Sequence, residues 1–99
     1  SRGLGDVYKR QPELRVPCPD SEKFAAMDTI TAHVLACNDP DAVSTIDGVR
    51  VRTDGGWWLL RASNTEAVLI ARAEAATKQR LDDLVGDIGS ALGVASLDW

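Results

Sequence analysis

The feature that most constrains the fold is a hairpin pattern in the middle of the chain. Residues 49–52 alternate apolar and charged side chains, which is typical of a strand with one buried face. Residues 54–56, Asp-Gly-Gly, tolerate the positive φ angles that a tight hairpin turn requires. Residues 57–60, Trp-Trp-Leu-Leu, predict a second strand that is apolar on both faces and therefore more central in the sheet.

The segments that follow extend this pattern. Residues 68–71, Val-Leu-Ile-Ala, predict a third strand, so the hairpin continues as an antiparallel meander. A helix is expected over residues 78–92, with Thr77 as its N-cap and Gly93 as its stop. One stripe of this helix is apolar at helical spacing and must pack on the sheet. The stripe comprises Leu81, Leu84, Val85, Ile88 and Leu92.

The N-terminal part of the chain gives weaker signals. It contains three prolines, Pro12, Pro17 and Pro19. Each proline fixes φ and biases its predecessor away from helix, so this segment should be extended. Residues 22–27 suggest a short strand, and residues 29–37 a helix with Asp28 as its N-cap, although β-branched residues leave a strand in competition there. The predicted fold class is α+β, with a four-stranded antiparallel sheet and two helices on one face.

The first eleven residues differ from the rest of the chain. They do not start with methionine, show no sustained hydrophobic period and carry a local positive charge. We interpret residues 1–11 as a non-native or disordered segment, which leaves residues 12–99 as the functional domain.

Charge and composition exclude several function classes. Eleven basic against fifteen acidic residues give a net charge of −4, which disfavours nucleic acid and anionic lipid as partners. The longest apolar run, residues 67–71, is far shorter than the roughly 20 residues of a membrane-spanning helix. With no secretion leader, a cytoplasmic protein is expected. One histidine and two cysteines at their spacing predict no metal site and no Cys–His chemistry.

One polar stretch between the second and third predicted strands could carry chemistry. Arg61 presents a planar fork of N–H donors that matches two phosphate oxygens. Ser63 and Thr65 add hydroxyl donors, and Asn64 tolerates the left-handed conformation that lets successive backbone N–H groups converge on an anion. These donors suit a phosphate monoester that must be held and later released.

The alternative is an ordinary solvated loop in which Arg61 pairs with Glu66. Serine, asparagine and threonine are common turn residues for local reasons, and the residues alone favour this alternative. Glu66 would also repel a phosphate dianion unless its carboxylate points away or orients Arg61.

A family resemblance changes this balance. Residues 45–75 resemble the C-terminal domain of the α-D-phosphohexomutases, most closely the bacterial phosphomannomutase/phosphoglucomutase branch. The matching positions are Asp47, Gly48, Val49, Arg50, Gly56, Trp57, Arg61, Ser63, Asn64, Thr65, Glu66, Glu74 and Ala75. Within the family, asparagine at position 64 favours the mannose and glucose enzymes over the phosphoglucosamine mutases. Ala67 departs from the family's usual proline, which puts the stiffness of the loop exit in doubt.

The resemblance implies a fold like that of the TATA-box-binding proteins and a set of phosphate-binding residues. Those residues are Arg61, Ser63, Asn64 and Thr65, with Arg72 as a further arginine on the following strand. The implied enzyme is an isomerase that interconverts hexose 1-phosphate and hexose 6-phosphate through a phosphoserine and a bisphosphate sugar.

The resemblance also implies what lies elsewhere. The family's catalytic serine, its Mg²⁺ site and its sugar-recognition loop belong to three preceding domains, and no corresponding motif occurs in this sequence. The chain is therefore expected to be a fragment that binds a phosphosugar, works with those upstream domains and catalyses nothing alone. Two other functions remain open: a free-standing anion-binding or protein-interaction module, and a nucleic-acid binder on the same saddle-like scaffold, which the acidic charge disfavours.

Overall fold

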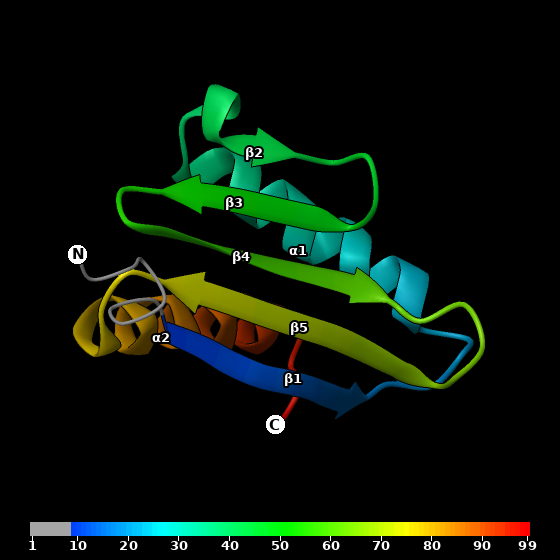
Figure 1. Cartoon of the computed structure of the whole chain (residues 1–99). Helices are drawn as coiled ribbons and strands as arrows, with labels where there is room; N and C mark the ends of the chain where they lie inside the picture. Colours follow the sequence, from blue (N-terminus) through cyan, green and yellow to red (C-terminus); the bar gives the residue numbers. More distant parts are fainter. Residues whose placement is uncertain (1–8) are drawn as a thin grey trace.

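The computed structural model describes residues 9–99, which fold into one antiparallel sheet and two helices (Figure 1). The five strands are β1 (Lys9–Pro17), β2 (Val43–Ser44), β3 (Val49–Thr53), β4 (Gly56–Ala62) and β5 (Val68–Ala75). Their order across the sheet is β1-β5-β4-β3-β2. The helices are α1 (Lys23–Cys37) and α2 (Lys78–Val94), and a short 3-10 helix, η2 (Pro40–Ala42), precedes β2.

Both helices lie on the same face of the sheet, behind it in Figure 1. Helix α2 packs against β1, β4 and β5, and α1 packs against α2 and β4. Alternate strand residues point toward the helices and form one core with them. The largest fully buried side chains are Ile30, Leu60, Leu69, Leu84, Ile88, Leu92, Val16, Val34, Val49, Val51 and Cys18. The predicted α+β class, with both helices on one face of an antiparallel sheet, is confirmed. Neither helix of residues 9–99 combines the length and the apolar content that crossing a membrane requires.

The central hairpin and the last helix form as predicted. Gly55 occupies the β3–β4 turn with a φ of 86°, a left-handed conformation that favours glycine. On β4, Trp58 is buried against the helices, while Trp57 points to the opposite face and is half-buried. The hydroxyl of Thr77 accepts the N–H of Arg80 at 3.1 Å and caps α2. This helix continues to Val94, slightly beyond the predicted end.

The strand expected over residues 22–27 is wrong. Residues 23–27 form the first turns of α1, and Asp28 is an exposed residue inside this helix rather than its N-cap. The buried residues of α1 recur every three or four positions and so share one helical face. They are Lys23, Met27, Ile30 and Val34.

Within residues 9–99 the sheet has five strands instead of four, because the strand expected over residues 22–27 is absent and two unexpected strands are present. The proline-containing segment forms β1, a full strand that pairs with β5, and β2 is a two-residue strand at the opposite edge. Strand β1 begins at Lys9 and so includes three residues of the segment interpreted as non-native or disordered. The rest of that segment, residues 1–8, lies outside the described residues.

Strand β1 contains a bulge that determines which of its side chains share a face. Gln11 pairs with Ala73 and Leu14 with Ala71, so Pro12 and Glu13 together lie opposite one residue of β5. Proline has no N–H to donate to the ladder, which explains the interruption at this point. The extra residue reverses the in–out alternation along β1. As a result Arg10, before the bulge, and Arg15, after it, point to the same side of the sheet.

Candidate functional site

The face of the sheet turned away from the helices, called the open face below, carries six arginines among residues 9–99. They are Arg10 and Arg15 on β1, Arg50 and Arg52 on β3, Arg61 on β4 and Arg72 on β5. On β3, β4 and β5 these side chains alternate with residues that are buried against the helices, and on β1 the strand register places Arg10 and Arg15 on the same face as Glu74 and Ile70. The open face is thus basic in a chain whose net charge is −4.

The arginines of the open face fall into two groups. Arg10, Arg15 and Arg72 each form an ion pair with a glutamate. The other three have no carboxylate partner within residues 9–99. The guanidinium of Arg50 stacks on the ring of Trp57, 4.4 Å from its centroid, and Arg52 donates a hydrogen bond to a backbone carbonyl. The available positive charge therefore lies on β3 and β4.

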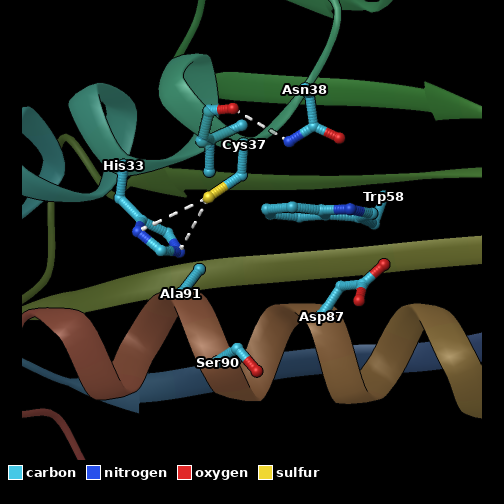
Figure 2. Close-up of a pocket in the computed structure, with 8 residues that line it drawn as sticks. His33, Cys37, Asn38, Trp58, Asp87, Ser90 and Ala91 are labelled. Carbon is cyan, nitrogen blue, oxygen red and sulfur yellow. Dashed lines mark hydrogen bonds between the residues drawn. The ribbon is translucent and has the colours of Figure 1, made fainter.

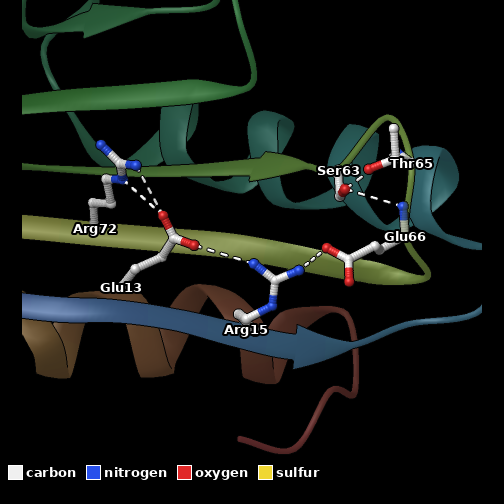
Figure 3. Close-up of polar contacts among 6 residues, drawn as sticks. All are labelled: Glu13, Arg15, Ser63, Thr65, Glu66 and Arg72. Atoms are coloured by element: carbon white, nitrogen blue, oxygen red, sulfur yellow. Dashed lines mark hydrogen bonds and ion pairs between the residues drawn. The ribbon is translucent and has the colours of Figure 1, made fainter.

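The loop after β4 is organised by one serine. Ser63 is buried, and its Oγ accepts the N–H groups of Thr65 and Glu66 at 3.2 and 3.1 Å (Figure 3). The N–H of Ser63 itself donates to the carbonyl of Val68 at 3.0 Å and closes the loop. A hydroxyl that accepts two N–H groups still carries one proton that it can donate. Ser63 thus fixes the loop and retains one donor.

The expected nest of N–H groups around a left-handed Asn64 does not form. Among residues 9–99, Ser96 is the only non-glycine residue with a positive φ, so Asn64 has an ordinary backbone. The N–H groups after it converge on the serine hydroxyl instead of on an open anion site. Local side-chain acceptors compete for loop N–H groups in this way.

Arg61 is the next-to-last residue of β4, close to the loop. It pairs with Ile70 of β5 and, on the other side, packs against the turn that precedes β3. At that turn Gly48 has a φ of 70°, and a β-carbon on it would lie 2.3 Å from the carbonyl oxygen of Leu60 and 2.5 Å from Cβ of Arg61. The backbone of Arg61 is therefore held by a contact that only glycine allows.

A chain of ion pairs runs across the open face and gives Glu66 a different partner from the one expected for an ordinary loop. The Glu66 carboxylate pairs with Arg15 of β1 rather than with Arg61. On its other side Arg15 contacts Glu13 at 3.2 Å, and Glu13 accepts two N–H groups of Arg72, the shorter bond measuring 2.8 Å. Figure 3 shows this row of four side chains. Hydrogen bonding to Arg72 lowers the pKa of Glu13 below its ordinary value.

The five predicted phosphate-binding residues therefore do not all point to one place. Four of them lie at the loop end of the sheet, whereas Arg72 lies in the middle of β5, opposite Leu59. Arg61 is on the open face, Ser63 is inside the loop, and Asn64 and Thr65 are exposed at its tip. Asn64 also borders a hollow of about 310 Å³ that reaches α1 and the turn at Gly48. Arg72 lies on the open face diagonally from Arg61, but Glu13 occupies its guanidinium.

The loop exit is anchored by residues that the sequence patterns did not indicate as functional. The Nζ of Lys23, a buried side chain at the start of α1, donates to the carbonyl of Glu66 at 3.0 Å and pairs with Asp20 at 2.9 Å. The N–H of Cys18 donates to the carbonyl of Ala67 at 2.9 Å. These two bonds hold the exit where the family's usual proline is replaced by Ala67. A lysine at a core position of a helix is the sequence signal that could have revealed the first bond.

Replacing Lys23 with methionine should therefore destabilise the chain by about 1–2 kcal/mol, because the Glu66 carbonyl loses its donor. Urea denaturation measures this change. Lys78→Met is the matched control, since Lys78 forms an exposed ion pair with Asp82 at 2.9 Å that should contribute less than about 0.5 kcal/mol. Equal losses in both variants would contradict the anchoring role of Lys23.

A separate hollow of about 160 Å³ lies between the two helices, away from the loop (Figure 2). Sγ of Cys37 lies 3.8 Å from Nε2 of His33, one helical turn away, and Asp87 is on the opposite wall. No hydrogen bond within residues 9–99 joins Asp87 to the imidazole, so the third group of a nucleophilic triad is not in place.

Cys37 and the buried Cys18 are both free. Residues 9–99 contain no cluster of three or more His, Cys, Asp or Glu side chains arranged to hold a metal ion.

Comparison with known proteins places this fold and loop in one family. The family model described as "Phosphoglucomutase/phosphomannomutase, C-terminal domain" matches residues 13–90. A probable phosphoglucosamine mutase of Pyrococcus abyssi is 32% identical over 83% of this chain and 19% of its own length. A phosphomannomutase/phosphoglucomutase of Pseudomonas aeruginosa is 38% identical over 72% of this chain and 15% of its own length.

A solved structure shows the same likeness. The crystal structure of a phosphoglucomutase/phosphomannomutase family protein from Burkholderia thailandensis superposes with a TM-score of 0.71 and 29% identity, over 92% of this chain and 19% of that one. The chain thus spans less than a fifth of the length of these three relatives. Because sequence and fold agree over most of residues 9–99, the chain belongs to the phosphoglucomutase/phosphomannomutase family and corresponds to its C-terminal domain.

Proposed function

We propose that this chain is the substrate-phosphate-binding domain of a phosphohexomutase, and that Arg61, Ser63, Asn64 and Thr65 bind the phosphate group. The observation that supports the proposal is the direction in which the Glu66 side chain points. Its carboxylate pairs with Arg15, which leaves Arg61 without a carboxylate partner within residues 9–99 beside a loop closed by Ser63. The planar fork of Arg61 can then take two phosphate oxygens.

In this proposal the loop residues make different interactions with the phosphate. Arg61 supplies the charge, Ser63 donates its remaining proton, and Asn64 and Thr65 can rotate toward the anion because they are exposed. Arg72 adds positive charge from the same face while its hydrogen-bonding groups remain on Glu13. These donors recognise a phosphate without recognising the sugar, so the domain can hold either end of a hexose bisphosphate.

The proposed reaction interconverts hexose 1-phosphate and hexose 6-phosphate in the full-length enzyme. Binding energy from the contacts to the non-reacting phosphate positions the other phosphate for reaction.

The phosphoserine and the Mg²⁺ that would support phosphoryl transfer are assigned to the enzyme's other domains, since the residues described here do not fit a metal site. Relatives include both phosphoglucosamine and phosphomannose/phosphoglucose mutases, so the proposal covers hexose phosphates as a class. The chain alone is proposed to bind and not to catalyse.

Titration of the chain with glucose 1-phosphate tests the proposal. We expect the backbone amide resonances of residues 63–65 to shift first, because a dianion bound by the side chains of these residues changes the electrostatic environment of their amides. Two-dimensional ¹H–¹⁵N spectra recorded over increasing ligand concentration measure this effect.

Glucose without phosphate serves as the control and should move none of these resonances. Shifts spread evenly over the surface, or concentrated at the hollow lined by His33 and Cys37, would contradict the proposed site.

A further inference from the structure

Glu66 is the only acidic residue of the loop between β4 and β5, and the structure keeps its two ends apart. Its N–H donates to Ser63 at 3.1 Å and so belongs to the loop, whereas its carboxylate reaches across β5 to Arg15. Figure 3 shows the carboxylate extending away from Ser63 and Thr65. The negative charge that would oppose a phosphate is thus neutralised on the β1 side.

Two arginines flank the strand that this carboxylate crosses, and Arg15 is the one that pairs with it. Arg15 and Arg61 both pair with Ile70 of β5, one from each side, so the three residues form a row across the sheet. Neighbouring strands are about 4.8 Å apart, which places the two arginines on either side of Ile70 at similar reach from the loop. Arg15 is held in place by Glu13 at 3.2 Å, and it points to the open face because of the bulge at Pro12 and Glu13.

We propose that Arg15 is a positioning residue of the phosphate loop, which binds the Glu66 carboxylate and so prevents it from occupying Arg61. The inference rests on the proposed function, because it concerns the same site. Without Arg15, the nearest cation in the row is Arg61, and a carboxylate there would both compete with phosphate and repel it. At the dielectric constant of water, one negative charge about 6 Å from a bound dianion lowers the affinity of the site for that dianion by about tenfold.

A double-mutant cycle tests this role. Kd for glucose 1-phosphate is measured at low ionic strength for the wild-type chain, Arg15→Ala, Glu66→Gln and the double variant. We expect Arg15→Ala to bind about tenfold more weakly and Glu66→Gln to bind at least as tightly as wild type. The Kd of the double variant should match that of Glu66→Gln within about twofold, because Glu66→Gln has already removed the carboxylate that Arg15 would hold away from Arg61.

Two further variants separate positioning from other effects. Arg15→Lys keeps a cation beside Glu66 and should retain most of the wild-type affinity. Arg10→Ala removes an arginine of the same strand and face, paired with Glu74 at 2.7 Å on the far side of the bulge, and should leave Kd nearly unchanged. Unfolding midpoints of all variants show that the compared chains are folded.

The outcomes distinguish this inference from the proposed function. If Arg15→Ala weakens binding equally in the wild-type and Glu66→Gln backgrounds, Arg15 attracts phosphate directly and the positioning role is wrong. If Arg15→Ala leaves Kd unchanged, the role is wrong as well. If the wild-type chain binds no glucose 1-phosphate, the proposed function fails and the inference fails with it.

Discussion

Gly48→Ala is expected to cost roughly 3 kcal/mol or more of unfolding free energy, the largest effect of a single methyl group that we expect in this chain. Two causes add. The φ of 70° is costly for any residue with a β-carbon, and that carbon would lie 2.3 Å from the Leu60 carbonyl and 2.5 Å from Cβ of Arg61. Both neighbours are on β4, at the centre of the hydrogen-bonded sheet, so neither can move cheaply. Urea denaturation at constant m-value measures the loss.

Substitutions at two other glycines separate the backbone cost from the steric clash. Gly55 also has a positive φ, 86°, but only side-chain atoms of Arg80 lie near a β-carbon there, at 3.6 Å. Gly55→Ala should therefore show the backbone cost alone, about 1–2 kcal/mol. Gly86 lies inside α2, and apart from its chain neighbours and its own helical backbone no atom lies within 4 Å of the new methyl group, so Gly86→Ala should stabilise the chain by up to about 1 kcal/mol. If Gly48→Ala costs no more than Gly55→Ala, the close approach to Arg61 is unimportant.

Arg61→Ala is expected to weaken glucose 1-phosphate binding by about 1.5–3 kcal/mol, which corresponds to roughly 10- to 150-fold in Kd. The reason is the loss of a charge-assisted, bidentate contact that the other loop donors, all neutral, do not replace. Calorimetry or the amide-shift titration measures the change. Arg61→Lys keeps the charge without the planar fork and should recover only part of the affinity.

Arg52→Ala is the matched control for Arg61. Arg52 lies on the same open face without a carboxylate partner within residues 9–99, but it is near the opposite end of the sheet and donates to the carbonyl of Asp41. Its removal should change Kd by less than about threefold at 0.15 M salt, where charges beyond about 8 Å are screened. Equal losses in the two variants would mean that the whole basic face, rather than the loop, attracts the ligand.

Elements with a clear local pattern of apolar and polar residues were predictable from the sequence. Strand β3 and helix α2 bury one side and expose the other, and β4 is a continuous apolar run after a glycine turn, so these patterns are visible within a few residues. The start of α1 was missed because its first core position is Lys23, a charged residue that hides the apolar spacing. Strand β1 was missed because Pro12 and Pro17 disfavour a regular strand and the pairing with β5 is distant in sequence.

The composition of the loop was visible in the sequence, but its polar connections were not. The polar stretch does lead from one strand to the next, as predicted, although Arg61 and Ala62 still belong to β4 and the connecting loop is residues 63–67. The partners of its charged groups depend on sheet register: Arg15 faces Glu66 only because β1 pairs with β5 and contains a bulge. The same holds for Glu13 and Arg72, which are brought together from opposite halves of the chain. Such pairs cannot be found by spacing within one segment.

The irregular strand β1 also affects how the molecule can associate. It forms one border of the sheet, and a regular border strand offers unpaired N–H and carbonyl groups on which a second polypeptide can add. Here two imino acids, Pro12 and Pro17, remove donors, and the bulge breaks the repeat that a neighbouring strand would need. The opposite border, β2, is only two residues long. Edge-to-edge aggregation is disfavoured at both borders, so any self-assembly of residues 9–99 is expected to use the faces of the molecule.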